Sequence, residues 1–139
     1  MRLGHLRLRW ASIFTKIVMG EIPCYKVAET EDCIAFLDIL PLAKGHVLVV
    51  PKKEVDYYFD LDDELFEKVN VLAKKVSHAI QKVVPCKRIG VSVIGLEVPH
   101  AHLHLVPINS ISDLDFTKNR VKLSEEEFKE LAEKISANL

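Results

Sequence analysis

Three histidines in one short segment are the feature of this sequence with the clearest chemical meaning. They occupy positions 100, 102 and 104 of the segment VPHAHLHLVP (98–107), out of six histidines in the whole chain. A spacing of two is the period of a β-strand, in which alternate side chains share a face. We therefore predict a strand here, with His100, His102 and His104 on one face and the apolar residues between them against a core.

Three imidazoles on one face support two kinds of chemistry. The first is metal binding, because zinc accepts neutral imidazole and an H-x-H pair on a strand can supply two ligands. Ligating histidines usually have carboxylate partners, and Glu97 is the nearest acid. The second is nucleophilic attack on phosphorus by a neutral imidazole, which is available near neutral pH because histidine ordinarily titrates at about 6.5. A phospho-imidazole would form, and the other two rings would contact the phosphoryl oxygens or the leaving group.

The composition limits the class of protein that carries these histidines. The chain has 139 residues, enough for one domain with a core, and 49% of them are apolar. The formal net charge is −1, so no strong positive field attracts nucleic acid. No apolar run reaches the roughly 20 residues that span a bilayer. Three cysteines without a paired pattern favour a reducing compartment, and we expect a cytoplasmic protein.

Local patterns predict the elements that must position the histidines. We expect a short helix at 12–19 capped by Ser12, strands at 25–29, 33–37, 46–50 and 88–94, and the histidine strand. A long helix is predicted at 61–84, with an apolar stripe and an acidic cap, Asp60 or Asp62. Ser124 and Glu127 form a capping box that begins a C-terminal helix. This order indicates an α+β protein with an antiparallel sheet covered by a helix.

The predicted organisation is one domain with two additions. Residues 1–10 carry three arginines but no long apolar block, and we interpret them as a loose N-terminal extension. The domain itself spans 11–112. Residues 113–139 form a C-terminal tail that is first irregular and then helical, and the helix either covers a pocket or coats the sheet.

Several segments together resemble one family. VPHAHLHLVP is similar to the His-φ-His-φ-His-φ-φ signature of the histidine triad (HIT) family, in which φ is an apolar residue. IFTKIVMGEIPCYKV resembles the N-terminal helix and first strand of that family, and CIAFLDILPLAKGHVLVVPKK resembles its nucleotide-binding strand-loop-strand segment. The resemblance covers about Ser12 to Asn109 and is closest to the Hint-like branch, which includes the purine nucleoside phosphoramidases. It implies a five-stranded antiparallel sheet and a homodimer with the long helix at its interface.

The resemblance also implies a reaction. His102, the middle histidine, would attack the α-phosphorus of a nucleoside 5′-phosphoramidate, and water would hydrolyse the nucleotidyl-histidine to a nucleoside monophosphate. His100 and His104 would orient the site and contact the phosphate or the leaving group. His46 matches a fourth histidine that supports the site from the neighbouring strand.

Binding residues follow from the same resemblance. Asp38 matches the residue that bonds the ribose hydroxyls, and four apolar residues match the walls of the base pocket. Those four are Phe14, Ile17, Phe36 and Ile39. The expected ligand is a purine nucleotide such as AMP, and no cofactor is implied. Some members carry zinc through an N-terminal C-x-x-C, but these positions are Ser12 and Thr15 here, so we expect no metal.

The sequence departs from the family just before the triad. Glu97 stands where many members have Ser or Thr, and its carboxylate would repel a phosphate if ionised or protonate a leaving amine if neutral. Ser92 is a candidate replacement for the pocket asparagine of the family, and Glu54 stands where a histidine is common. Two alternatives therefore stay open beside the phosphoramidase: a dinucleoside polyphosphate hydrolase and a non-catalytic nucleotide-binding module.

Overall fold

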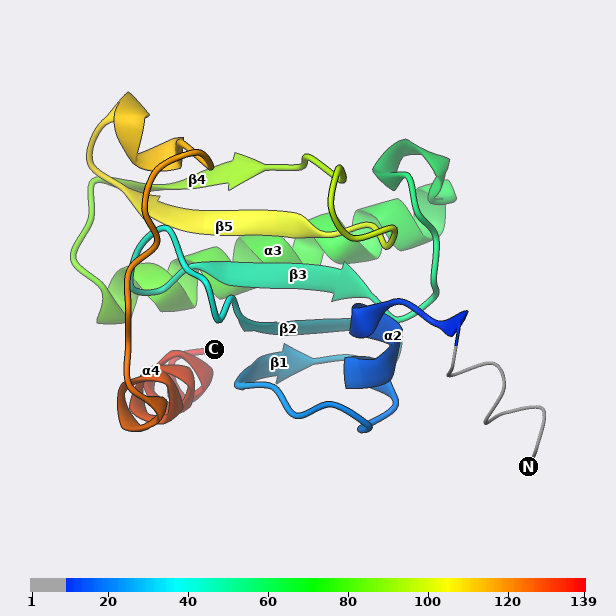
Figure 1. The fold of residues 1–139 in the computed structure, drawn as a ribbon, viewed down its shortest axis with the longest axis horizontal. Coiled ribbons are helices and arrows are strands. Elements are labelled where there is room, and N and C mark those ends of the chain that lie inside the picture. Colours follow the sequence, from blue (N-terminus) through cyan, green and yellow to red (C-terminus); the bar gives the residue numbers. More distant parts are fainter. Residues whose placement is uncertain (1–9) are drawn as a thin grey trace.

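Five strands form one antiparallel sheet in the computed structural model, which describes residues 10–139 (Figure 1). The strands are β1 (Lys26–Glu29), β2 (Cys33–Leu37), β3 (Val47–Pro51), β4 (Arg88–Ser92) and β5 (Leu103–Ile108). Their order across the sheet is β1-β2-β3-β5-β4, and every neighbouring pair is antiparallel. The predicted α+β class with a five-stranded antiparallel sheet is confirmed.

The helices begin where the sequence predicted their caps. In the described part of the chain the α-helices are α2 (Ile13–Val18), α3 (Asp63–Val83) and α4 (Glu125–Ala137), with 3₁₀ turns η1 (Tyr58–Asp60) and η2 (Ile111–Leu114). Ser12, Asp62 and Ser124 each accept a hydrogen bond from the backbone N–H three residues later. Such caps satisfy amide groups that the first turn of a helix leaves unpaired.

The two faces of the sheet carry separate apolar clusters. On one face, β2, β3 and β5 pack against α3, whose predicted stripe is confirmed by the buried residues Val69, Leu72, Val76 and Ile80. On the other face, Ile34, Phe36, Leu48 and Val50 pack around Phe14 of α2. Figure 1 shows α3 behind the sheet and α2 in front of it. Because β2 and β3 are buried on both faces, their sequences are apolar throughout.

The C-terminal helix joins the main core rather than forming a separate unit. Its buried residues Phe128, Leu131, Ala132 and Ile135 pack with the α3 side of the sheet, and Phe128 stacks on Tyr25 with ring centroids 5.0 Å apart. The segment between η2 and α4 crosses the front of the sheet at one end (Figure 1). Residues 1–9 of the predicted extension lie outside the described residues, and the predicted boundary at 112 stays a prediction.

No helix among residues 10–139 has both the length and the apolar character needed to cross a membrane. The cysteines Cys24, Cys33 and Cys86 are free thiols.

Candidate active site

The three histidines lie on the sheet face opposite α3, but only one of them is in the strand. The prediction of a strand from position 98 is wrong in its start, because β5 begins at Leu103. The preceding amides have other partners: His100 N–H donates to Val98 O and Ala101 N–H donates to Val55 O. β4 is likewise shorter than predicted and ends at Ser92. A loop therefore carries His100 and His102 into place.

The orientation of His102 follows from a hydrogen bond to its neighbour. Its Nδ1 lies 2.7 Å from the carbonyl oxygen of His100, and a carbonyl can only accept. Nδ1 therefore carries the proton, and in the neutral ring Nε2 keeps its lone pair. Phe14 packs edge-on against this ring, with centroids 4.9 Å apart, and limits its rotation. The result is a fixed imidazole with a nucleophilic nitrogen.

His46 and His104 form a relay whose proton positions can also be assigned. Leu42 N–H donates to His46 Nδ1 at 3.0 Å, so His46 must carry its proton on Nε2. That Nε2–H donates to His104 Nδ1 at 2.9 Å, which leaves His104 with a proton on its own Nε2. Burial, with the positive charge of Arg120 and the neighbouring histidines, lowers the pKa of both rings to about 3. His104 is thus a neutral hydrogen-bond donor.

Asp38 lies at the end of β2, beside this relay. Its Oδ1 accepts from Leu40 N–H at 2.8 Å, and its Oδ2 lies 3.5 Å from His46 Nε2. Burial raises the pKa of its carboxyl group. The Asp38 side chain is still partly exposed, so it can contact a ligand hydroxyl.

His100 is fully buried and belongs to a second network. Its Nε2–H donates to Pro51 O at 2.8 Å, so Nδ1 accepts, and Ser12 Oγ–H donates to it at 2.6 Å. Glu54 closes the network, because its Oε1 accepts from Ser12 N–H at 2.6 Å and from Thr15 Oγ1–H at 2.8 Å. The Ser12 amide above all lowers the pKa of Glu54. This network joins α2 to the loop that orients His102.

A cavity of about 520 Å³ lies against His102 and His104. It is lined by six of the predicted binding residues: Phe14, Ile17, Phe36, Asp38, Ile39 and Glu97. Of these, Phe14 and Phe36 are buried and meet edge to face, with ring centroids 5.7 Å apart. An apolar slot therefore lies beside a polar end formed by imidazoles and carboxyl groups, the usual character of a small-molecule site.

Three predicted site residues do not line the cavity. His100 and His46 lie behind it, where each supports a histidine that does. Ser92 is the register partner of His104 on β4. Glu97, in contrast, is exposed on the loop at the cavity wall.

Two of the lining residues that the sequence analysis did not predict come from a segment to which it gave no role in the site. Phe116 and Arg120 come from the segment between η2 and α4, which was interpreted only as polar and irregular. Phe116 packs edge-on against His104, with centroids 4.7 Å apart. No residue of α4 lines the cavity, so of the two roles considered for that helix, coating the core is the observed one. The sequence signal that could have predicted this wall of the cavity was Phe116, an aromatic residue in an otherwise polar segment.

Among residues 10–139, one group of side chains has the composition of a metal site. The nearest ligand atoms of Asp38, His46 and His104 all lie within 4.8 Å of one another. In the tautomers assigned above, however, the proton on His46 Nε2 lies between the two rings. A cation would have to displace that proton and break the relay. At the positions of the C-x-x-C motif, Ser12 and Thr15 instead hydrogen-bond Glu54 and His100.

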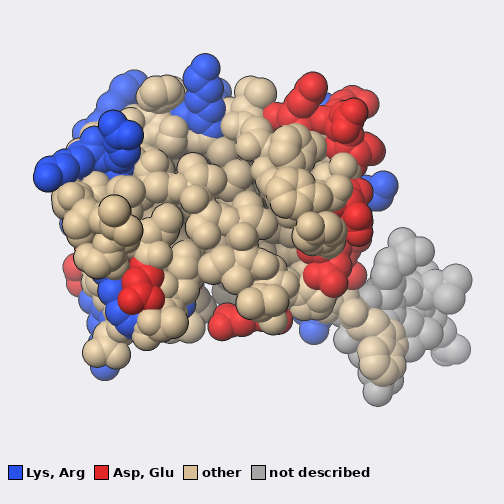
Figure 2. All heavy atoms as spheres, turned by 90° about the horizontal axis from the view of Figure 1, so that it is seen from above, with Lys and Arg blue, Asp and Glu red and all other residues tan. Residues whose placement is uncertain are grey.

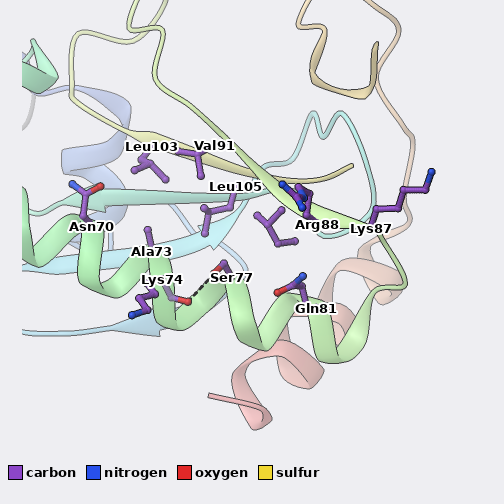
Figure 3. A pocket seen from close by; sticks show the side chains of 11 residues that line it. Asn70, Ala73, Lys74, Ser77, Gln81, Lys87, Arg88, Val91, Leu103 and Leu105 are labelled. Atoms are coloured by element: carbon purple, nitrogen blue, oxygen red, sulfur yellow. Dashed lines mark hydrogen bonds between the residues drawn. The ribbon is translucent and has the colours of Figure 1, made fainter. Parts of the chain in front are cut away.

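A separate groove lies on the opposite side of the sheet, between α3 and the edge strand β4 (Figure 3). Ala73, Leu103 and Leu105 are apolar residues of this groove, and Lys74, Lys87 and Arg88 are its basic residues. It contains none of the triad histidines.

Comparison with known proteins identifies the family. The HIT domain matches residues 19–111. An adenosine 5′-monophosphoramidase of Schizosaccharomyces pombe is 39% identical over 130 residues, covering 91% of this chain and 97% of that protein. An uncharacterized HIT-like protein of Borreliella burgdorferi is 37% identical over 135 residues, with the same coverage. The crystal structure of a HIT-like protein from Bartonella henselae superposes with a TM-score of 0.80 at 34% identity, covering 92% of this chain and 96% of that one. The chain therefore belongs to the histidine triad (HIT) family.

Proposed function

We propose that this HIT protein hydrolyses the P–N bond of nucleoside 5′-phosphoramidates and releases a nucleoside monophosphate, with His102 as the nucleophile. The hydrogen bond from His102 Nδ1–H to the His100 carbonyl carries this proposal, because in the neutral ring it puts the proton on Nδ1 and the lone pair on Nε2, and His102 lines the cavity. The similarity to a protein named adenosine 5′-monophosphoramidase supports the same reaction. Membership of the HIT family supports the broader class of nucleotide hydrolase.

The reaction proceeds in two displacements. His102 Nε2 attacks the α-phosphorus, a P–N bond to the imidazole forms, and the P–N bond to the amine breaks. His104 Nε2–H donates to a phosphoryl oxygen, because its pKa of about 3 keeps the ring neutral and its Nδ1 accepts from His46, which leaves the proton on Nε2. The departing amine takes a proton from water at the cavity. Water then attacks the phosphorus, and His102 leaves as free imidazole.

The cavity accounts for recognition of the nucleoside. The carboxyl group of Asp38 would accept hydrogen bonds from the ribose hydroxyls, and the slot between Phe14 and Phe36 would hold the purine, whose flat apolar surface suits aromatic walls. Ile17 and Ile39 complete the slot. His100 would act through its carbonyl oxygen and His46 through its bond to His104.

The test is release of AMP from adenosine 5′-phosphoramidate by purified protein. His78 is exposed on α3, so His78→Ala is the matched control for His102→Ala. We expect wild type and His78→Ala to turn over equally, and His102→Ala to be slower by about a thousandfold or more. Wild-type protein that binds AMP but releases none would refute the phosphoramidase. Dinucleoside polyphosphates would then separate the polyphosphate hydrolase from a binding module.

We also propose that the protein is a homodimer in which β4 pairs with its own copy. β4 is an edge strand with a half-exposed Val91, and unpaired edges of this kind favour strand addition. Figure 2 shows Lys and Arg gathered at one end of the face seen from above and Asp and Glu at the other. A two-fold axis through β4 would place the basic end of one protomer against the acidic end of its partner. The groove in Figure 3 would be covered in this dimer.

Sedimentation velocity tests the dimer. Val91→Glu places a charge on the free edge, and we expect it to give monomers. Met19→Glu introduces the same charge at the exposed apolar C-cap residue of α2, away from β4, and should leave the dimer intact. A wild-type protein that sediments as a monomer at micromolar concentration would refute this proposal.

We infer a cytoplasmic location from the free cysteines. Three free thiols, Cys24, Cys33 and Cys86, suit a reducing compartment. The test is fractionation of cells of the source organism with an antibody against the chain, and recovery in an oxidising compartment would contradict the inference.

A further inference from the structure

The segment between η2 and α4 forms one wall of the cavity. In Figure 1 it runs in orange across the front of the sheet, from η2 down to α4. Val121 N–H donates to Pro41 O at 2.9 Å and fastens the segment to the loop that follows Asp38. The whole segment lies beyond residue 111, where the family match ends. This wall is therefore supplied by a part of the chain outside the shared domain.

Phe116 and Arg120 are the side chains with which this segment reaches the site. The Phe116 ring lies edge-on to His104 and also contacts His46, with centroids 6.2 Å apart. The Arg120 guanidinium lies over the Phe116 ring, with its carbon 5.6 Å from the ring centroid. Phe116 thus contacts both Arg120 and His104.

The guanidinium of Arg120 is held in place but keeps free donors. Nη1 donates to Leu40 O at 3.1 Å and Nη2 donates to Phe116 O at 3.2 Å. A guanidinium has five N–H groups, so these two bonds leave three for other partners. Its side chain is only partly buried and borders the cavity. A cation fixed in this way is preorganised for an anion.

The charges around the cavity explain why a cation is needed. Among the described residues that line it, Arg120 is the only Lys or Arg, whereas Asp38 and Glu97 contribute two carboxyl groups. His104 is neutral, so it can donate a hydrogen bond but cannot balance charge. Without Arg120, a phosphate in this cavity would meet only neutral donors and carboxylates.

We propose that Arg120 is a specificity-determining residue that pairs with the 5′-phosphoryl group of the nucleotide and makes this site select nucleotides over nucleosides. The proposal deepens the proposed function and shares its nucleotide ligand. In this arrangement Asp38 and the apolar slot bind the nucleoside, and Arg120 pairs with the negative charge of the phosphoryl group. Loss of a charge-assisted hydrogen bond of this kind weakens binding about 10- to 100-fold.

Calorimetric titration of the full-length chain with AMP and with adenosine tests the proposal. Lys118 provides a matched control, because it lies in the same segment but bonds Ser112 O and pairs with Asp113 rather than lining the cavity. We expect Arg120→Gln to weaken AMP binding about 10- to 100-fold and to change adenosine binding less than about twofold. Lys118→Gln should change neither.

Three results would overturn the proposal. AMP binding unchanged in Arg120→Gln would remove the role of Arg120, and an equal loss for adenosine would show that Arg120 only holds the wall in place. If Arg120→Gln does not fold, Arg120→Lys is the second variant: it keeps the positive charge, so a retained preference for AMP over adenosine would support the proposal, and an equal loss of both ligands would refute it. Because the readout is binding, absence of phosphoramidate turnover would refute the proposed function and leave this result standing.

Discussion

Ser12 offers the sharpest test of how the site is held together. Its hydroxyl accepts from Thr15 N–H at 3.0 Å as the cap of α2, and donates to Nδ1 of the buried His100 at 2.6 Å. The Ser12 hydroxyl thus caps α2 and also holds His100, whose carbonyl oxygen orients His102. We predict that Ser12→Ala destabilises the fold by more than the loss of a cap alone.

The expected cost follows from these two bonds. Loss of a Ser cap costs about 1 kcal/mol of unfolding free energy. A buried imidazole nitrogen left without its donor costs about 1–3 kcal/mol more. The sum is about 2–4 kcal/mol. Thr15 Oγ1 lies 3.3 Å from the same nitrogen and can partly replace Ser12, so the double variant Ser12→Ala/Thr15→Val should reach the upper end.

Ser124 supplies the matched control, because it caps α4 in the same way and is part of a capping box. We therefore expect Ser124→Ala to cost about 1 kcal/mol. Urea unfolding at neutral pH, followed by circular dichroism at equal protein concentrations, measures both variants. Equal costs for Ser12→Ala and Ser124→Ala would refute the reasoning, since the bond to His100 would then contribute nothing to stability.

Two further predictions concern the relay and the loop beside it. His46 and His104 have a folded pKa of about 3 but bind protons near 6.5 when unfolded, so the unfolding free energy should fall as the pH falls from about 6.5 toward 3. Urea unfolding at several values between about pH 5 and about pH 6 gives the slope of the unfolding free energy against pH. We expect this slope to be about 1.4 kcal/mol per pH unit shallower in His46→Gln than in the wild type, and an unchanged slope would contradict a buried neutral His46 in the relay. A Cβ on Gly45, at φ +97°, would lie 2.9 Å from Val84 Cγ2, so thermal unfolding should show Gly45→Ala to be destabilised by about 1–3 kcal/mol. Gly20→Ala, at φ +77° with no atom within 4 Å, should cost less, and equal costs would count against the close packing of Gly45.

The sequence by itself determined the elements and the chemical type of the site. The apolar runs of β2 and β3, the stripe of α3 and the caps Asp62 and Ser124 are read from neighbours along the chain, and the structure confirms them. The spacing of the histidines indicated a functional cluster, and the resemblance to the HIT family named the residues around it. These features are predictable because helices and strands obey short-range periodicity and capping.

Only the tertiary structure decided how the histidines are protonated and what surrounds them. His102 turns toward the His100 carbonyl, and the strand starts after both, because Val55 and not β3 receives the amide of Ala101. The bonds from Ser12 to His100 and from Arg120 to Leu40 join residues 88 and 80 positions apart. No local pattern encodes such contacts, because they exist only once the sheet has brought the two ends of the chain to one cavity.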